Sequence, residues 1–198
     1  MDRSRDLNYS EEEVQRILKD LNFRMASVAT NNLILVQAVD KKLVANLVSA
    51  YYNGHYLFES NPLIVTEINS NNKSSHLAVL DGTHRATAAY LLRINNLIAA
   101  HIDINNENLL IYGTNSTEIP KPDFMTFLQE IADSNISPSS YPPYYYCNHK
   151  ILQFYNRFNL QPLKPIYLIY VDDSGKHYNL KYVVKQYLKL AKGNLRIG

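Results

Sequence analysis

Cysteine and tryptophan are scarce in this sequence, and long hydrophobic runs are absent from it. It has one cysteine, Cys147, and no tryptophan among 198 residues. Because a lone cysteine cannot form an intramolecular disulfide, we expect a buried core to provide the stability and a reducing, cytoplasmic location. No apolar run reaches the roughly 20 residues that span a bilayer, and the charged residues 2–20 are unlike a signal peptide. We therefore expect no membrane partner.

Neither sign of charge is in large excess. The chain has 20 Lys and Arg against 18 Asp and Glu, a formal net charge of +2. Because a dedicated duplex-binding domain usually carries a strong positive field, this composition does not indicate nucleic acid as the main partner, although a local basic patch is compatible with it. The length suits one ordinary domain, which we expect over residues 1–198.

The first hundred residues alternate between helical and strand patterns. Ser10 and Glu13 have the spacing of a capping box, and Asn53-Gly54 is a typical helix end. We expect helices over residues 10–21, 40–52 and 83–93, and strands over 33–39, 62–68, 76–82 and 97–104. This order predicts a compact α/β unit over residues 25–105, with a small mixed sheet flanked by helices.

The second half is less regular. We expect helices over residues 123–134, capped by Asp123, over 150–158 and over 179–193, and a strand over 165–171 followed by a turn. The segment SPSSYPPYYYC, residues 137–147, interrupts regular structure, and its tyrosines either stack on a base or pack a loop against the body. We interpret residues 106–198 as a C-terminal elaboration that closes one side of a cleft.

The segment Asp81-Gly82-Thr83-His84-Arg85 joins the expected strand 76–82 to the expected helix 83–93. A glycine lets the backbone turn sharply, and the first N–H groups of a helix have no partner within it. Together with the helix dipole they favour an anion such as phosphate. Arg85 has a fork of donors for phosphate oxygens and His84 has one or two. Asp81 can hold Mg²⁺ or accept a hydroxyl proton.

A plainer interpretation of the same five residues stays open. In it Asp81 caps the helix, Arg85 pairs with a surface carboxylate and His84 is exposed. Two residues of the expected helix 40–52, Lys42 and Asn46, can face the same phosphates, although Lys42 is more typical of a solvated charge. The histidines have no ligand-like spacing, so we expect no zinc site.

The stretch LDGTHRATAAYLL, residues 80–92, resembles the ParB/sulfiredoxin superfamily, in which a Gly-x-His-Arg or related turn binds nucleotide phosphates at a helix start. The order of elements over residues 33–104 is also similar. The resemblance implies a ParB/sulfiredoxin-like α/β fold for residues 25–105, with a helical C-terminal elaboration. Sulfiredoxins have a cysteine where this chain has Thr83, which cannot form their thiosulfinate. Partition-type ParB proteins have a Gly-Glu-Arg-Arg-like turn and a helix-turn-helix that we do not find after residue 105.

The free-serine kinases of this superfamily carry Asp-Gly-His-His-Arg, which residues 81–85 match at four of five positions. The resemblance implies that Asp81 lies at the reacting centre and holds Mg²⁺. It also implies that His84 and Arg85 bind the phosphates of ATP, ADP or CTP with the amides of Gly82 and Thr83. Asp81 and His84 are therefore the expected catalytic residues.

One residue departs from the kinase pattern. Where those kinases have a glutamate that is taken as the base, this chain has Gln37, and a glutamine cannot accept a proton at neutral pH. Asp40, Glu59 or Glu67 would replace it, or Asp81 would act alone. We expect a nucleotide-dependent kinase that transfers a phosphoryl group to a hydroxyl of a small-molecule acceptor, for example an amino acid such as serine.

Two other functions remain open. A ParB-like regulator would use the nucleotide as a switch and touch nucleic acid with the basic helix near the C-terminus, whose cations also fit a solvated helix face: Lys181, Lys185, Lys189, Lys192 and Arg196. Alternatively, a biosynthetic enzyme would keep the fold and act on another substrate.

Overall fold

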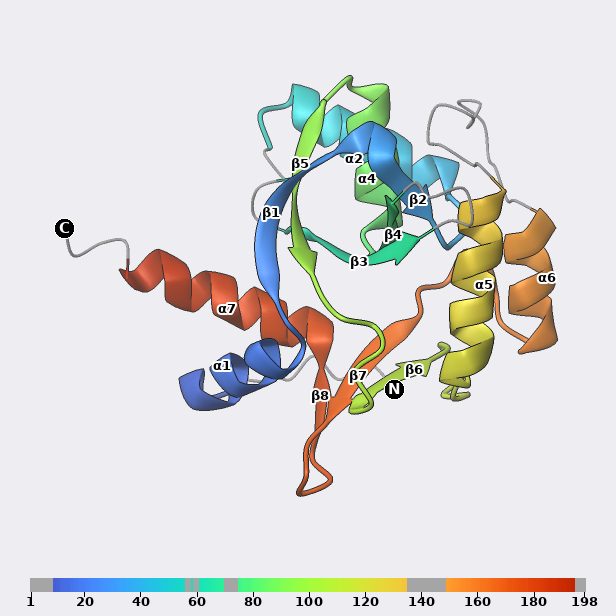
Figure 1. Cartoon of the computed structure of the whole chain (residues 1–198). Helices are drawn as coiled ribbons and strands as arrows, with labels where there is room; N and C mark the ends of the chain where they lie inside the picture. Colours follow the sequence, from blue (N-terminus) through green and yellow to red (C-terminus); the bar gives the residue numbers. More distant parts are fainter. Residues whose placement is uncertain (1–8, 56–57, 59–60, 70–74, 135–148, 195–198) are drawn as a thin grey trace.

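The computed structural model describes residues 9–55, 58, 61–69, 75–134 and 149–194. Its elements follow one another along the chain as a mixed α/β order (Figure 1). They are α1 (Glu11–Asp20), β1 (Arg24–Ala29), η1 (Thr30–Asn32), β2 (Leu33–Leu35), α2 (Lys41–Tyr52), β3 (Leu63–Asn69), β4 (Ser75–Asp81), α4 (Thr83–Leu91), β5 (Asn96–His101), β6 (Leu109–Tyr112), α5 (Lys121–Asp133), α6 (His149–Arg157), β7 (Tyr167–Val171), β8 (His177–Asn179) and α7 (Leu180–Asn194).

The larger sheet has five strands in the order β1-β5-β3-β4-β2. Strands β2 and β4 run parallel, as do β3 and β5, and the other pairs are antiparallel. In this register Asp81 lies opposite Ile64, near the start of β3. The expected small mixed sheet flanked by helices is therefore present. Parallel β2 and β4 are each followed by a helix, so α2 and α4 both begin at the same edge of the sheet.

The C-terminal half contains strands as well as helices. Strands β6, β7 and β8 form an antiparallel three-stranded sheet, and α5, α6 and α7 accompany it. Helix α1 packs against α7, which brings two ends of the described chain side by side (Figure 1). None of the described helices is long and apolar enough to cross a membrane.

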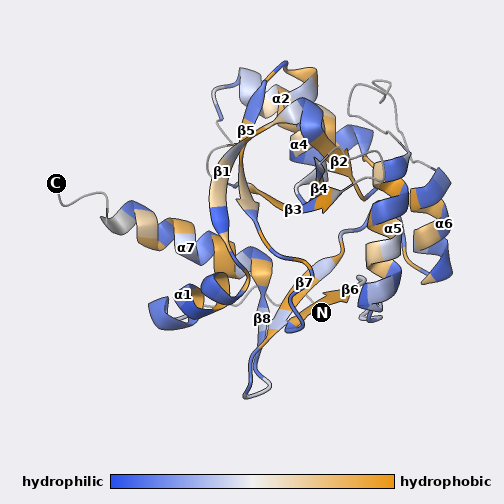
Figure 2. Cartoon of the chain, viewed as in Figure 1, coloured by the Kyte–Doolittle hydropathy of each residue, from blue (hydrophilic) through white to orange (hydrophobic). Residues whose placement is uncertain are grey.

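Two hydrophobic cores lie on opposite faces of the larger sheet, because successive strand side chains point to opposite sides. Leu63 and Val65 pack with residues of α2 and α4. Ile64 and Ile68 pack into the larger core, which also takes residues from α1, the second sheet, α5, α6 and α7. Figure 2 shows the hydrophobic strands in the interior and hydrophilic residues on the outer faces of α1 and α6. One core therefore joins both halves of the chain.

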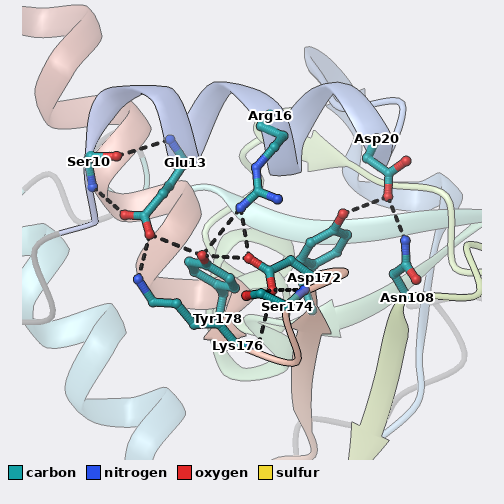
Figure 3. A network of polar contacts seen from close by, with 10 residues as sticks. Ser10, Glu13, Arg16, Asp20, Asn108, Asp172, Ser174, Lys176 and Tyr178 are labelled. Atoms are coloured by element: carbon teal, nitrogen blue, oxygen red, sulfur yellow. Dashed lines mark hydrogen bonds and ion pairs between the residues drawn. The ribbon is translucent and has the colours of Figure 1, made fainter.

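A polar network ties α1 to the β7–β8 hairpin (Figure 3). The buried hydroxyl of Tyr178 lies 2.9 Å from Asp172 Oδ2 and 3.0 Å from Glu13 Oε1. Arg16 donates to the same Asp172 oxygen at 2.9 Å, and Lys176 donates to Glu13 at 2.5 Å. Because each carboxylate has several donors, the network holds its charges without leaving them unpaired.

The expected helix starts are largely confirmed, and the reasons are local. Ser10 and Glu13 form the capping box, with Ser10 N–H donating to Glu13 Oε2 at 2.8 Å. Asp40 caps α2 through the N–H groups of Lys42 and Leu43. The predicted cap Asp123 is wrong: Pro120 takes that position in α5, and Asp123 pairs with Arg157 at 2.7 Å.

The strands were predicted less completely. The expected strand over 33–39 is paired only over Leu33–Leu35; its buried remainder connects β2 to α2, and Ala38 N–H there donates to the Pro162 carbonyl at 3.0 Å. Strands β1, β6 and β8 were not predicted. The tyrosine-rich segment 137–147, which includes Cys147, lies outside the described residues.

Candidate functional site

Gly82 forms the turn between β4 and α4, and it has a left-handed backbone with φ of +102°. A Cβ atom at this position would lie 2.5 Å from Leu63 Cδ2 and 2.9 Å from Arg85 Nη2. Both the backbone angle and the close approach exclude larger residues without local rearrangement. Glycine is therefore needed for α4 to start against β3 and to bring Arg85 over the turn.

Helix α4 begins without a side-chain cap, unlike α1 and α2. Gly82 has no side chain to accept from the first-turn amides, and no described residue accepts from the N–H groups of Thr83, His84 or Arg85. Thr83 is buried, with 2% of its surface exposed, and its Oγ1 has no partner among the described residues. The positive end of the α4 dipole therefore has no side-chain acceptor among the described residues, and it would favour an anion.

His84 joins the start of α4 to the start of α2. Its Nε2 accepts a hydrogen bond of 2.9 Å from the N–H of Asp40. Burial lowers the pKa of His84, the nearby carboxylates of Asp40 and Asp81 opposing the shift. The ring is therefore neutral at pH 7 with its proton on Nδ1, and that N–H can donate to a ligand.

Arg85 turns back over the end of β4. Its Nη2 donates to Asp81 Oδ2 at 2.8 Å, and its Nη1 donates to the carbonyls of Pro62, at 2.9 Å, and Asn61. The side chains of Arg85 and Asp81 are 15% and 24% exposed. These contacts fix the guanidinium in one orientation. Arg85 does pair with a carboxylate, but the carboxylate belongs to the same turn.

Two lysines of α7 extend this cluster of charge. Lys181 Nζ lies 3.9 Å from Asp81 Oδ1. A cavity of about 90 Å³ lies beside the turn, and its lining comprises Asn61, Pro62, Ile64, Asp81, Arg85, Lys181, Tyr182, Val184, Lys185 and Leu188. Arg85, Lys181 and Lys185 therefore line the cavity with one carboxylate, Asp81, and this excess of positive charge would favour an anion.

Sequence reasoning did not assign Lys181 and Lys185 to the site. It placed them only in a basic stripe, because no local pattern indicates that α7 folds back over residues 81–85. The structure brings Asp81 and Arg85 together with these two lysines around one cavity, whereas Gly82, Thr83 and His84 are not among its lining residues. Lys42 and Asn46 are exposed on α2, and neither side chain bonds to the turn among the described residues.

The alternative bases are placed differently from one another. Asp40 lies beside His84, but its Oδ1 accepts from the first turn of α2. Glu67 lies toward the other end of β3 from Ile64, the partner of Asp81, and it accepts from Ser75 at 2.6 Å. Gln37 is buried, and Glu59 lies outside the described residues. Asp81 is therefore the carboxylate within the described turn.

The described side chains do not fit a magnesium ion held by the protein. One oxygen of Asp81 is bound by Arg85, and the other faces Lys181. The described residues also contain no group of three or more His, Cys, Asp or Glu side chains arranged as a metal site. Because Mg²⁺ in proteins is usually held by one or two carboxylates together with substrate phosphates and waters, an ion at this turn would have to compete with Arg85 and Lys181 for Asp81.

The comparisons with known proteins are weak. No protein-family model matches the chain, and neither does a curated protein. The similar solved structures include a conserved hypothetical protein from Pyrococcus furiosus, with 11% identity, a TM-score of 0.38, and coverage of 46% of this chain and 37% of that chain. They also include a free serine kinase in complex with AMP, with 10% identity, a TM-score of 0.38, and coverage of 45% and 35%.

A third similar structure is SbnI with a C-terminal truncation from Staphylococcus aureus, with 12% identity and a TM-score of 0.34. The match covers 83% of this chain and 77% of that chain. The first two matches span little more than a third of the other protein. At these scores the likenesses identify no function for this chain.

Proposed function

We propose that this protein is a nucleotide-dependent phosphotransferase that binds the phosphates of its nucleotide at the start of α4. The observation that carries the proposal is the uncapped first turn of α4, whose Arg85 lines a cavity with Lys181 and Lys185. Free N–H groups, a helix dipole and fixed cations are the features that bind phosphate in proteins. Phosphoryl transfer relies mainly on positioning and on neutralising charge, which these groups would supply.

The residues of the turn would have separate roles. The N–H groups of Thr83, His84 and Arg85, with Nδ1–H of His84, would bind the phosphate oxygens. Lys181 and Lys185 would neutralise their charge. The acceptor hydroxyl oxygen would bond to the terminal phosphorus as the bond to the bridging oxygen breaks, and the electron pair would leave with the shortened nucleotide. The hydroxyl proton would pass to Asp81, the carboxylate at the turn.

A binding experiment tests the phosphate site first. The purified protein is titrated calorimetrically with ATP, ADP and CTP. Lys181→Gln and Lys185→Gln should each weaken binding about tenfold, because each removes a charge-assisted contact. Lys189→Gln is the matched control, since it removes the same charge from an exposed position of α7 that does not line the cavity. Absence of binding by all three nucleotides would contradict the proposal.

Turnover distinguishes the kinase from a nucleotide-binding regulator. We expect label from the terminal phosphate of the bound nucleotide to appear on a small hydroxyl compound, detected by mass spectrometry of acceptor mixtures. Asp81→Asn should abolish transfer while nucleotide still binds. Binding without transfer would support the regulator instead. In that case the affinity of the protein for DNA would be measured at increasing salt. A steep fall in affinity would support binding through the exposed lysines of α7.

A further inference from the structure

A second cavity, of about 320 Å³, lies where β3 and β5 end and β1 begins. Its lining residues are mostly polar: Asn22, Arg24, Thr66, Glu67, His101, Ile102, Asp103 and Asn105. None of them lines the cavity beside Asp81. The size is at the lower end of the range for small-molecule sites in proteins. The motif at residues 81–85 does not account for this cavity.

Two polar residues of this cavity are buried, Thr66 and His101, and of these Thr66 has a hydrogen-bonded side chain. Only 8% of the surface of His101 is exposed, and its Nε2 has no hydrogen-bond partner among the described residues. Burial and the neighbouring Arg24 lower its pKa, so the ring is neutral at pH 7. Buried polar atoms are nearly always paired, since leaving one unpaired costs free energy. A histidine with only a packing role would not need this unpaired atom.

Charges of both signs stand around His101. Arg24 and Glu67 approach to 4.0 Å, and their side chains are 64% and 56% exposed, so the pair is weak. Asp103 adds a second carboxylate. The described side chains are not arranged as a metal site. The cavity thus offers a guanidinium and two carboxylates that a ligand with its own opposite charges can use.

We propose that this cavity binds a small zwitterion of the α-amino-acid class, at a site separate from the α4 turn. The guanidinium of Arg24 would bind its carboxylate, because the two planar groups form paired hydrogen bonds. Glu67 and Asp103 would bind its ammonium group. A polar side chain of the ligand would give Nε2 of His101, which is buried, the partner that it lacks once the ring turns toward the cavity. Binding at this cavity does not depend on the proposed phosphotransferase activity.

Binding of free amino acids by the full chain tests this site. Each of the proteinogenic L-amino acids is screened by thermal shift at about 10 mM, and the strongest binder is titrated by calorimetry. Its N-acetyl derivative lacks the ammonium charge, and its amide lacks the carboxylate. We expect each derivative to bind at least tenfold more weakly. Arg24→Gln and Glu67→Gln should each have an effect of the same size.

Controls separate this site from the α4 turn. Lys181→Gln and Lys189→Gln should leave amino-acid binding unchanged. His101→Phe should weaken amino-acid binding, although without ligand this variant should unfold at a temperature equal to or above that of the unmodified protein. The proposal is overturned if no amino acid shifts the midpoint, or if the derivatives bind as tightly as the parent compound. It is also overturned if Lys181→Gln abolishes binding and Arg24→Gln does not.

Discussion

Two regions of the molecule differ in how their buried polar groups are paired. One is the network between α1 and the β7–β8 hairpin, and the other is the turn at the start of α4. In the network, Asp172 accepts from Arg16, Ser174 and the Lys176 amide, and it lies within hydrogen-bond distance of Tyr178. At the turn, the α4 amides are uncapped, and Thr83 Oγ1 is buried without a partner among the described residues. The first arrangement stabilises the fold, whereas the second leaves polar groups unpaired at a cost in stability.

The largest effect should come from the turn. Gly82→Ala would combine a left-handed backbone with crowding against Leu63, and we expect it to lower the free energy of unfolding by about 3 kcal/mol. Gly175→Ala is the control, because Gly175 also has a positive φ, of +78°, but open space around it. Gly175→Ala should lower the free energy of unfolding by about 1 kcal/mol. Urea denaturation measures both, and equal losses would contradict the crowding.

The network should be the next most sensitive region. Tyr178→Phe removes the hydroxyl shared by Glu13 and Asp172 and should cost about 2 kcal/mol in urea denaturation. Tyr52→Phe removes a hydroxyl from a side chain on a residue that is 77% exposed, and it should change stability little. A loss below about 0.5 kcal/mol for Tyr178→Phe would show that the network contributes little.

Acid should weaken the same network. Lys176, the Ser10 amide and Tyr178 lower the pKa of Glu13 from 4.5 to about 2, and Ser174 and Arg16 lower the pKa of Asp172. Because these pKa values are lower in the folded state, the stabilisation is complete above about pH 5 and is lost as the pH falls toward 2.

The measurement is the urea midpoint at pH 5 and at pH 2.5. We expect Glu13 to account for about 1 kcal/mol of the difference, since its partner Lys176 is largely exposed. Glu13→Gln should therefore show a flatter dependence on pH. An unchanged slope in this variant would mean that other carboxylates govern the acid transition.

The smallest effect should come from Thr83. Thr83→Val removes a hydroxyl with no partner among the described residues, so stability should stay the same or rise slightly. Thr66 is as buried as Thr83, with 2% of its surface exposed, but its hydroxyl donates to the Ile102 carbonyl at 3.1 Å. Thr66→Val should cost about 1 kcal/mol. Similar losses for the two variants in thermal or urea unfolding would remove the contrast between paired and unpaired hydroxyls.

Local signals predicted much of the fold. Ser10 with Glu13, Asp40 and Asn53-Gly54 marked helix ends because capping depends on neighbouring residues. Strand β1 was not predicted, because Val28 is its one buried residue and the strand therefore has no alternating hydrophobic pattern. Strands β6 and β8 have four and three residues, too few for a periodic signal. Strand β6 also pairs with β7, which the chain reaches much later.

The candidate site was predicted in part for the same reason. The turn at residues 81–85 is contiguous, so its glycine and its charged residues were visible together. The pairing of Arg85 with Asp81 was not predicted, because Asp81 ends β4 and the pair depends on the turn at Gly82. Lys181 and the Asp40 amide approach the turn only through tertiary packing. His101 looked like an isolated histidine, because its neighbours Arg24 and Glu67 come from other strands.

The larger core also limits how this protein can be divided. Ile64, Ile68 and Ala78 belong to the sheet of the N-terminal half, yet the side chains that cover them include Phe124, Tyr155 and Val183. A fragment of residues 25–105 would expose that apolar face to water and would self-associate. Domain exchange or recombination between relatives would therefore have to carry both halves together.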